Sequence, residues 1–233
     1  MAFTSKYGSL LILLSLMPTW AGALVTAQNV TDKHTLAISL NIATTELDRL
    51  DILYSDTDWM FDFFAQPTYT YSPGAVINAN AATFPTTVGN GLTLAWVTLG
   101  PCGMQAPHYH PRASNYIVAI DGSVETYMIA ENGARMVTNL LGPGKMTLFP
   151  RGSLHSMQNK GCGNATLVSA LSTEDPGTHT VANGLFNLPR DMVAAAFGGN
   201  KNLDIDDLMK AIPPVGTGVT MGSADCLAKC SMQ

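Results

Sequence analysis

Charged side chains are scarce in this sequence. Aspartate, glutamate, lysine and arginine make up 12% of its 233 residues, against roughly 25% in typical soluble domains. The lysines and arginines are also scattered, and the net charge is −5. A nucleic-acid-binding surface needs a basic patch, so this composition excludes nucleic acid as an expected partner.

Long apolar runs are missing beyond the first two dozen residues, so no later segment predicts a membrane-spanning helix. At the start of the chain, Lys6 precedes the apolar run LLILLSLM at 10–17, and Ala-Gly-Ala follows at 21–23. A positive residue, a short apolar stretch and a small-x-small site are typical of a secretory signal peptide. We expect cleavage after Ala23, which removes Lys6, changes the net charge from −5 to about −6, and leaves a secreted protein without a membrane anchor.

Cysteine is limited to four residues, an even number that suits an oxidising compartment. N-glycosylation sequons begin at Asn29 and Asn164. Both features agree with the predicted signal peptide and favour a secreted glycoprotein.

Short β-rich runs dominate the middle of the chain. Pro, Gly, Asn and Thr interrupt apolar runs from about residue 67 onward, and a further strand is expected over 165–173. Asp-Gly at 121–122 and Asn-Gly at 132–133 are typical hairpin turns. Strands of this length with regular turns predict a β-sandwich or a small barrel.

Helical patterns are confined to the two ends of the chain. Apolar spacing predicts a short helix near 47–53, and two more helices are expected over 189–198 and 203–212, each bounded by proline or glycine. The domain organisation we expect is a signal peptide at 1–23, an N-terminal extension at 24–66, a β-barrel at 67–185 and a helical tail at 186–233.

Three of the five histidines lie in strand-like segments. His108 and His110 are two residues apart, so on one strand they share a face. His155, from a later strand, would complete a set of three imidazoles. Imidazole suits zinc, copper, iron and nickel, with carboxylates added for manganese. The pattern predicts a site for one divalent transition metal, either copper, zinc, iron or manganese.

The spacing around these histidines resembles the two motifs of the cupin family. The fixed positions of the second motif are all present, as Gly144, Pro150, Gly152, His155 and Asn159. His108-x-His110 and Gly122 match the first motif, and Asn115 stands where the family usually has glutamate. The chain is similar to secreted fungal germin-like and spherulin-like cupins with one cupin domain, over about residues 45–215.

This resemblance implies an all-β fold, the cupin double-stranded β-helix or jelly-roll barrel, with a short N-terminal helix and C-terminal helices. It implies that His108, His110 and His155 bind the metal, with Asn115 at the fourth ligand position. It also implies a small-molecule substrate. The C-terminal helices of germins form subunit contacts, which leaves a homo-oligomer open here.

The resemblance bears on the cysteines as well. Cys102 stands at the first glycine position of the first motif, and Cys162 lies seven residues after His155. The two strands involved are antiparallel neighbours in a cupin barrel, so the disulfides expected are Cys102–Cys162 and Cys226–Cys230. Four cysteines allow three pairings, and another connectivity or free buried cysteines stay open.

Asparagine in place of glutamate changes the charge of the metal site. Three neutral histidines leave a divalent metal with a charge of about +2, instead of the +1 that a carboxylate would give. We expect weaker metal binding, a stronger Lewis acid, and a preference for copper or zinc over manganese. Asn115 also cannot take a proton, and Glu125, the nearest acid on the following strand, is expected to face solvent. Oxalate oxidation, which germins perform, is therefore disfavoured.

Large side chains around the motifs are candidates for the walls of a substrate pocket. If they line it, the substrate is an apolar or aromatic ring compound that Arg112 holds by an acidic or phenolic group. Each apolar candidate also fits an ordinary core position, and Arg112 fits a salt bridge on the rim. The candidates are Trp96, Met104, Arg112, Met128, Phe149 and Met157.

Two functions stay open. One is a secreted metal-dependent enzyme that acts on a small organic molecule, such as a phenolic or polyketide-like product of secondary metabolism. Oxidation, ring cleavage, and Lewis-acid-assisted cyclisation or isomerisation are compatible with such a site. The other is a non-catalytic protein of the cell wall or spore coat, in which the metal site is vestigial or structural.

Overall fold

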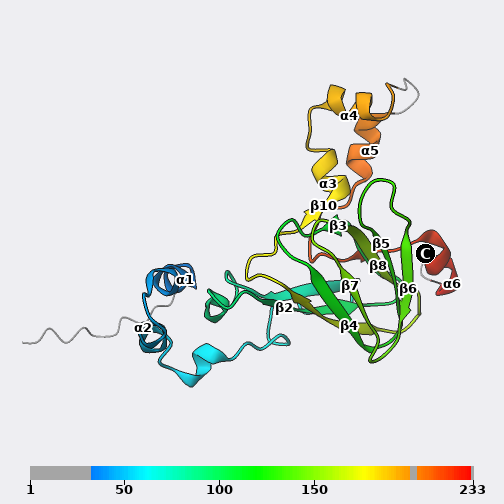
Figure 1. Cartoon of the computed structure of the whole chain (residues 1–233). Helices are drawn as coiled ribbons and strands as arrows, with labels where there is room; N and C mark the ends of the chain where they lie inside the picture. The colour runs from blue at the N-terminus through cyan, green and yellow to red at the C-terminus, as the bar shows by residue number, and fades with distance from the viewer. Residues whose placement is uncertain (1–32, 200–203, 232–233) are drawn as a thin grey trace, which may run out of the picture. The chain divides into compact units, whose positions relative to one another are not determined.

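Two antiparallel β-sheets organise the chain (Figure 1). The computed structural model describes residues 33–199 and 204–231, so the predicted signal peptide and the sequon at Asn29 lie outside the described residues. In spatial order, the first sheet contains β1 (Gly74–Ala79), β2 (Thr93–Leu99), β9 (Ala165–Leu171), β4 (Asn115–Asp121) and β7 (Met146–Phe149). The second contains β10 (His179–Thr180), β3 (Gly103–Tyr109), β8 (Leu154–Asn159), β5 (Val124–Ile129) and β6 (Val137–Leu141), and β11 (Thr220–Met221) also pairs with β3. The predicted all-β fold class is confirmed.

Turns join successive strands at both predicted positions, but only the turn at 132–133 closes a hairpin, because β5 pairs with β6 whereas β4 and β5 lie in different sheets. Asp-Gly at 121–122 lies between β4 and β5, and Asn-Gly at 132–133 lies between β5 and β6. Gly122 has a φ of 74°, and a Cβ atom there would lie 2.6 Å from the Cβ atom of Ala165. Only glycine therefore fits this position, both for its backbone conformation and for the close approach of β9.

An apolar core fills the space between the sheets. Alternate residues of the central strands face inward, as the period of two in a β-strand requires. Val97, Ile117 and Leu167 come from the first sheet, Val124 and Met157 from the second, and each is at most 1% exposed. Burying one such side chain contributes roughly 1.5–3 kcal/mol, so this layer holds the two sheets together.

Helices occur on both sides of the β-rich region. The three predicted helices are confirmed as α2 (Glu46–Ile52), α4 (Arg190–Ala196) and α5 (Ile205–Ala211). The structure adds the α-helices α1 (Lys33–Ile42), α3 (Val181–Leu185) and α6 (Ala224–Lys229), and the 3-10 helices η1 (Asp56–Trp59) and η2 (Pro85–Thr87). None of the helices in the described part of the chain is long and apolar enough to cross a membrane.

The C-terminal segment contributes a strand as well as helices. Residues 213–221, which we call the C-terminal strap, run along β1 and then pair with β3. The backbone N–H of Val76 donates to the carbonyl of Thr217 at 2.9 Å, and the Thr217 hydroxyl donates to the carbonyl of Gly74 at 2.7 Å. In β11, Thr220 pairs with Met104. The strap is therefore attached to both sheets by backbone hydrogen bonds.

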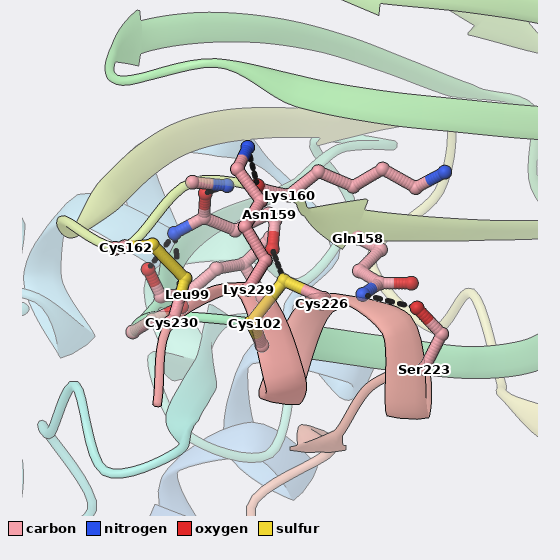
Figure 2. The surroundings of a disulfide bond; sticks show 12 residues. Leu99, Cys102, Gln158, Asn159, Lys160, Cys162, Ser223, Cys226, Lys229 and Cys230 are labelled. Atoms are coloured by element: carbon pink, nitrogen blue, oxygen red, sulfur yellow. Dashed lines mark hydrogen bonds between the residues drawn. A yellow bond between two sulfur atoms is a disulfide. The ribbon is translucent and has the colours of Figure 1, made fainter. Parts of the chain in front are cut away.

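The disulfides differ from the expected pairing (Figure 2). Cys102 is bonded to Cys226, and Cys162 is bonded to Cys230. The predicted closeness of Cys102 and Cys162 is nevertheless present, because the Cys102 N–H donates to the carbonyl of Gly161 at 3.3 Å. Connectivity is decided instead by α6, in which Cys226 and Cys230 are four residues apart and share one face. That face lies against the end of the β3–β8 pair, so Cys226 meets Cys102, directly before β3, and Cys230 meets Cys162, in the turn after β8.

The two disulfides differ in exposure. Cys102 and Cys226 are both buried, at 0% and 4% exposed, whereas Cys162 is exposed and lies in the turn between β8 and β9. Asn164 is exposed in the same turn, and its glycosylation stays a prediction. The buried bond joins residues 124 positions apart in the sequence, and the outer bond joins residues 68 apart.

We predict that removing the buried disulfide destabilises the chain more than removing the outer one. The Cys102→Ala/Cys226→Ala variant should lose about 3–5 kcal/mol of unfolding free energy, because it loses a long-range cross-link and leaves a gap in a buried site. The matched Cys162→Ala/Cys230→Ala variant should lose less. Urea unfolding of the two variants and the wild type measures this difference, and equal losses would contradict it.

Candidate metal centre

Three histidines converge from adjacent strands of the second sheet. His108 lies in β3 directly opposite His155 in β8, and His110 follows the end of β3. The pairing of β3 with β8 shifts register between Gln105 and His108. Residues three apart on a regular strand face opposite sides, but this shift lets the side chains of Gln105 and His108 both line the same cavity. Pro107 occupies this irregular stretch, where a residue without an N–H group is tolerated in a strand.

The three imidazoles lie close together and away from solvent. The ring centroids of His108 and His155 are 4.3 Å apart, and those of His110 lie 5.2 and 5.3 Å from the other two. One ring nitrogen of each lies within 4.8 Å of the others, and the side chains are at most 8% exposed. Such a cluster of three imidazoles has the composition and spacing of a transition-metal site.

Backbone carbonyl groups determine which ring nitrogen carries the hydrogen. The Nδ1 atoms of His108, His110 and His155 lie 2.8, 2.7 and 2.8 Å from the carbonyls of Ala106, Gly177 and Ser153, respectively. A carbonyl can only accept, so each Nδ1 donates and each Nε2 keeps a free lone pair. The Nε2 of His155 is buried and has no hydrogen-bond partner among the described residues. A buried nitrogen with a free lone pair needs a partner, and a metal ion fits that need.

Burial keeps the three rings neutral at physiological pH. Desolvation lowers the pKa of His155 to about 3 and that of His108 to about 4, and neighbouring histidines add to both shifts. Desolvation also lowers the pKa of His110. Neutral imidazole is the form that binds metals, so no proton has to leave these rings when an ion enters.

Asn115 reaches the same cavity from the first sheet. It begins β4, is 4% exposed, and lines the cavity together with His108 and His110. Its side-chain oxygen accepts a short hydrogen bond from the hydroxyl of Ser169 in β9. Ser169 is itself 3% exposed and also lines the cavity. Asn115 is thus held by a polar neighbour that sequence reasoning did not single out.

The cavity has a volume of about 360 Å³. Its apolar part comes from inward positions of the first sheet, namely Val76, Ala95, Val97 and Leu171. The remaining wall comes from two segments outside the main strands, at 175–180 and in the strap at 213–218. Amide and hydroxyl groups are added by Asn78, Asn80, Thr178, Thr180 and Asn183. This space is large enough for a small organic molecule beside His108 and His110.

Comparison with known proteins identifies the family. The cupin family model matches residues 63–204, which include all three histidines. The chain belongs to the cupin family. It is 32% identical over 192 residues to spherulin-1B of Physarum polycephalum, an alignment that covers 82% of this chain and 76% of that protein. It is also 34% identical over 152 residues to germin-like protein 4-1 of Oryza sativa subsp. japonica, covering 58% of this chain and 59% of that one.

Solved structures share the fold of this cupin. A structure of oxalate oxidase superposes with a TM-score of 0.60 at 23% identity, covering 67% of this chain and 81% of that one. Oxalate decarboxylase from Bacillus subtilis gives a TM-score of 0.60 at 19% identity, covering 69% of this chain and 40% of that one. These similarities show the two-sheet fold and do not carry a substrate to this cupin.

None of the six side chains expected in the pocket lines the cavity of this cupin. Met128, Phe149 and Met157 pack in the apolar core, and the Phe149 ring stacks on His155 at a centroid distance of 4.2 Å. Met104 alternates with the inward residues Gly103 and Gln105 and pairs with the strap. The pocket walls expected from the sequence are therefore wrong, and Met128, Phe149 and Met157 occupy the core positions that were left open for them.

Trp96 lies on the outer face of the first sheet for the same reason of alternation. Its neighbours Ala95 and Val97 line the cavity, so Trp96 points the opposite way. Its ring packs against Phe63 and Phe64, at centroid distances of 6.0 and 5.3 Å. Trp96 therefore packs the end of the N-terminal extension against the first sheet.

The charged candidates also lie outside the cavity. Arg112 donates to the carboxylate of Asp175 at 2.7 Å on the exposed rim, which is the alternative left open for it. Glu125 pairs with Lys160 at 2.6 Å, and hydrogen bonds from Lys160 and Tyr127 lower the pKa of its carboxyl group. Asp175 is then the one carboxylate among the described residues that line the cavity, and Arg112 neutralises it.

We predict that acid destabilises the metal-free chain through these histidines. Their pKa lies below the ordinary value of 6.5, so the unfolded chain takes up more protons than the folded chain as the pH falls. The unfolding free energy should fall from about pH 6.5 toward pH 4, by up to about 1.4 kcal/mol per pH unit for each histidine.

Urea unfolding of the metal-free wild type and of His155→Gln between pH 4 and pH 7.5 measures this dependence. The variant should show a shallower slope, since one proton-accepting group has been removed from the unfolded chain. Equal pH dependence of the unfolding free energy in the two proteins would contradict a lowered pKa for His155.

Proposed function

We propose that this cupin is a secreted metalloenzyme that binds one divalent transition metal and acts on a small organic molecule. The observation that carries the proposal is the cluster of three neutral, buried imidazoles, two of which line the cavity, with the Nε2 of His155 lacking any partner among the described residues. Two disulfides in a chain with four cysteines support a secretory route. A homo-oligomer stays a prediction.

His108, His110 and His155 would hold the metal, and the bound ion would supply a Lewis acid or a redox centre. No carboxylate stands among the three, so a divalent ion would keep a charge of about +2. Imidazole ligands without a carboxylate favour copper or zinc over manganese.

The chain itself would bind and orient the substrate. The apolar part of the cavity suits a hydrocarbon ring or chain. It includes Val76, Val97 and Leu171. Asn80 and Asn183 offer amide groups that can hydrogen-bond hydroxyl or carbonyl groups. A phenolic or polyketide-like compound has both kinds of surface.

The cavity offers little for proton transfer. Asp175 is paired with Arg112, and the carbonyl groups hold the three Nδ1 hydrogens. Reactions that the metal can promote without a protein base fit this setting best, such as oxidation, ring cleavage, or cyclisation and isomerisation assisted by a Lewis acid.

A second candidate is a non-catalytic protein of the cell wall or spore coat with a structural metal site. The same lack of a free carboxylate in the described cavity favours it, since no residue there is poised as a general base. Turnover separates the two candidates, because the structural protein would bind metal without consuming any substrate.

We predict one metal ion per mature chain, bound by the three histidines. His155→Ala should weaken Cu(II) and Zn(II) binding by about 100-fold or more. Removing a residue that only hydrogen-bonds a metal ligand already lowers metal affinity about 10–100-fold, and His155 is itself a proposed ligand. Metal analysis of the purified chain and competition with a chelator measure stoichiometry and affinity.

His179→Ala is the matched control. His179 is exposed and stacks on Tyr109 at a centroid distance of 4.9 Å, outside the cluster. It should keep wild-type affinity. Less than about a tenth of an ion per wild-type chain would overturn the metalloenzyme proposal.

We predict that Asn115→Glu raises Mn(II) affinity at least about 10-fold, because the new carboxylate adds a charged oxygen ligand to three imidazoles. Titration of the metal-free variant with Mn(II), followed by electron paramagnetic resonance of the free ion, measures the change. An unchanged affinity would show that the asparagine does not control metal preference, and oxalate turnover by the variant would show that it also redirected the reaction.

A further inference from the structure

Asn115 and Ser169 form a buried polar pair in the cavity wall. They lie on the neighbouring strands β4 and β9, where Asn115 pairs with Leu171 and Ser169 with Ile117, so the two side chains meet diagonally. The Ser169 hydroxyl donates to Asn115 Oδ1 in a short hydrogen bond. Both residues also line the cavity beside His108 and His110.

This hydrogen bond decides which end of the amide is available. Asn115 is 4% exposed, and its Nδ2 atom has no hydrogen-bond partner among the described residues. Its oxygen is occupied by Ser169, so the NH₂ group is the part left for the cavity. An amide nitrogen has no free lone pair, and it can only donate hydrogen bonds.

We propose that Asn115 is a hydrogen-bond donor to the ligand that binds the metal, held in place by Ser169, and that it does not itself coordinate the ion. The proposal rests on the metal site proposed above. It gives Asn115 a role opposite to that of a glutamate at this position, which would present lone pairs and a negative charge.

The donor selects a class of substrate. An NH₂ group beside a divalent ion stabilises a ligand atom that is negatively charged and accepts hydrogen bonds, such as the oxygen of a carboxylate, phenolate or enolate. A carboxylate at the same place would repel that atom. The site is therefore suited to substrates that bind the metal through an anionic oxygen, with the rest of the molecule against the apolar wall formed by Val97 and Leu171.

Azide binding to the Cu(II)-loaded full-length mature chain tests this role, because azide is an anionic hydrogen-bond acceptor that binds open copper sites. Asn115→Leu keeps the side-chain size and removes the donor. It should leave Cu(II) affinity within about 3-fold and the copper resonance spectrum unchanged, while weakening azide binding about 10-fold, as expected for the loss of one charge-assisted hydrogen bond. Ser169→Ala should weaken azide binding in the same direction by a smaller factor, since the donor remains but is no longer oriented.

Asn139→Leu makes the same chemical change on the exposed strand β6 and should change neither measurement. A 10-fold or greater loss of Cu(II) affinity in Asn115→Leu, with a changed resonance spectrum, would show that Asn115 is a ligand and would overturn the inference. Unchanged azide binding in that variant would also overturn it. Failure of the wild-type chain to bind Cu(II), Zn(II) or Mn(II) would instead overturn the proposed function, and the donor role with it.

Discussion

The antiparallel pairing of β3 with β8 is the constraint on which the rest of the structure depends. At one end of the pair, His108 stands opposite His155, and the histidine cluster forms. At the other end, the Cys102 N–H meets the carbonyl of Gly161, and both disulfides attach α6 there (Figure 2). A shift of one residue along this pair would turn every side chain to the other face of the sheet. The site and the covalent cross-links therefore depend on the same register.

The neutrality of the cavity follows from how its polar groups are satisfied. Backbone carbonyls engage the histidine Nδ1 atoms, Ser169 engages Asn115, and Arg112 engages Asp175. Each polar group has one partner fixed by the fold and one atom or lone pair directed elsewhere. Burial penalises any net charge beside the histidines, so the protein supplies oriented dipoles there, and the Arg112–Asp175 ion pair stays on the exposed rim. The charge of a bound metal would then be the dominant local field.

Much of the fold and the first half of the site could be predicted from the sequence. The turns at 121–122 and 132–133, the helices α2, α4 and α5, and the shared cavity of His108 and His110 all depend on local patterns of two to ten residues, whereas the pairing of β4 with β9 instead of β5 does not. The pocket walls could not be predicted in this way. Whether Trp96 and Met104 face inward or outward depends on the register of their strands, and the sequence does not mark where either strand begins. An error of one residue reverses the direction of the side chain. Ser169 carried a usable signal, as a lone polar residue at the inward position of an apolar strand. The disulfide connectivity depended on α6, a short helix far along the chain that its own sequence does not strongly predict.

In the C-terminal strap, the residues that anchor the segment are mostly separate from the residues that line the cavity. Its end is anchored by β11 and by a helix with two covalent attachments, while residues 213–218 between α5 and that anchor face the cavity. The intervening stretch carries no metal ligand and no core residue of the sheets. Apart from Thr217, which hydrogen-bonds to β1, and Gly218, which packs closely on Val76, its side chains do not support the register of β3 and β8. Substitutions in residues 213–218 can therefore change which molecules the cavity accepts, while the three histidines stay in place.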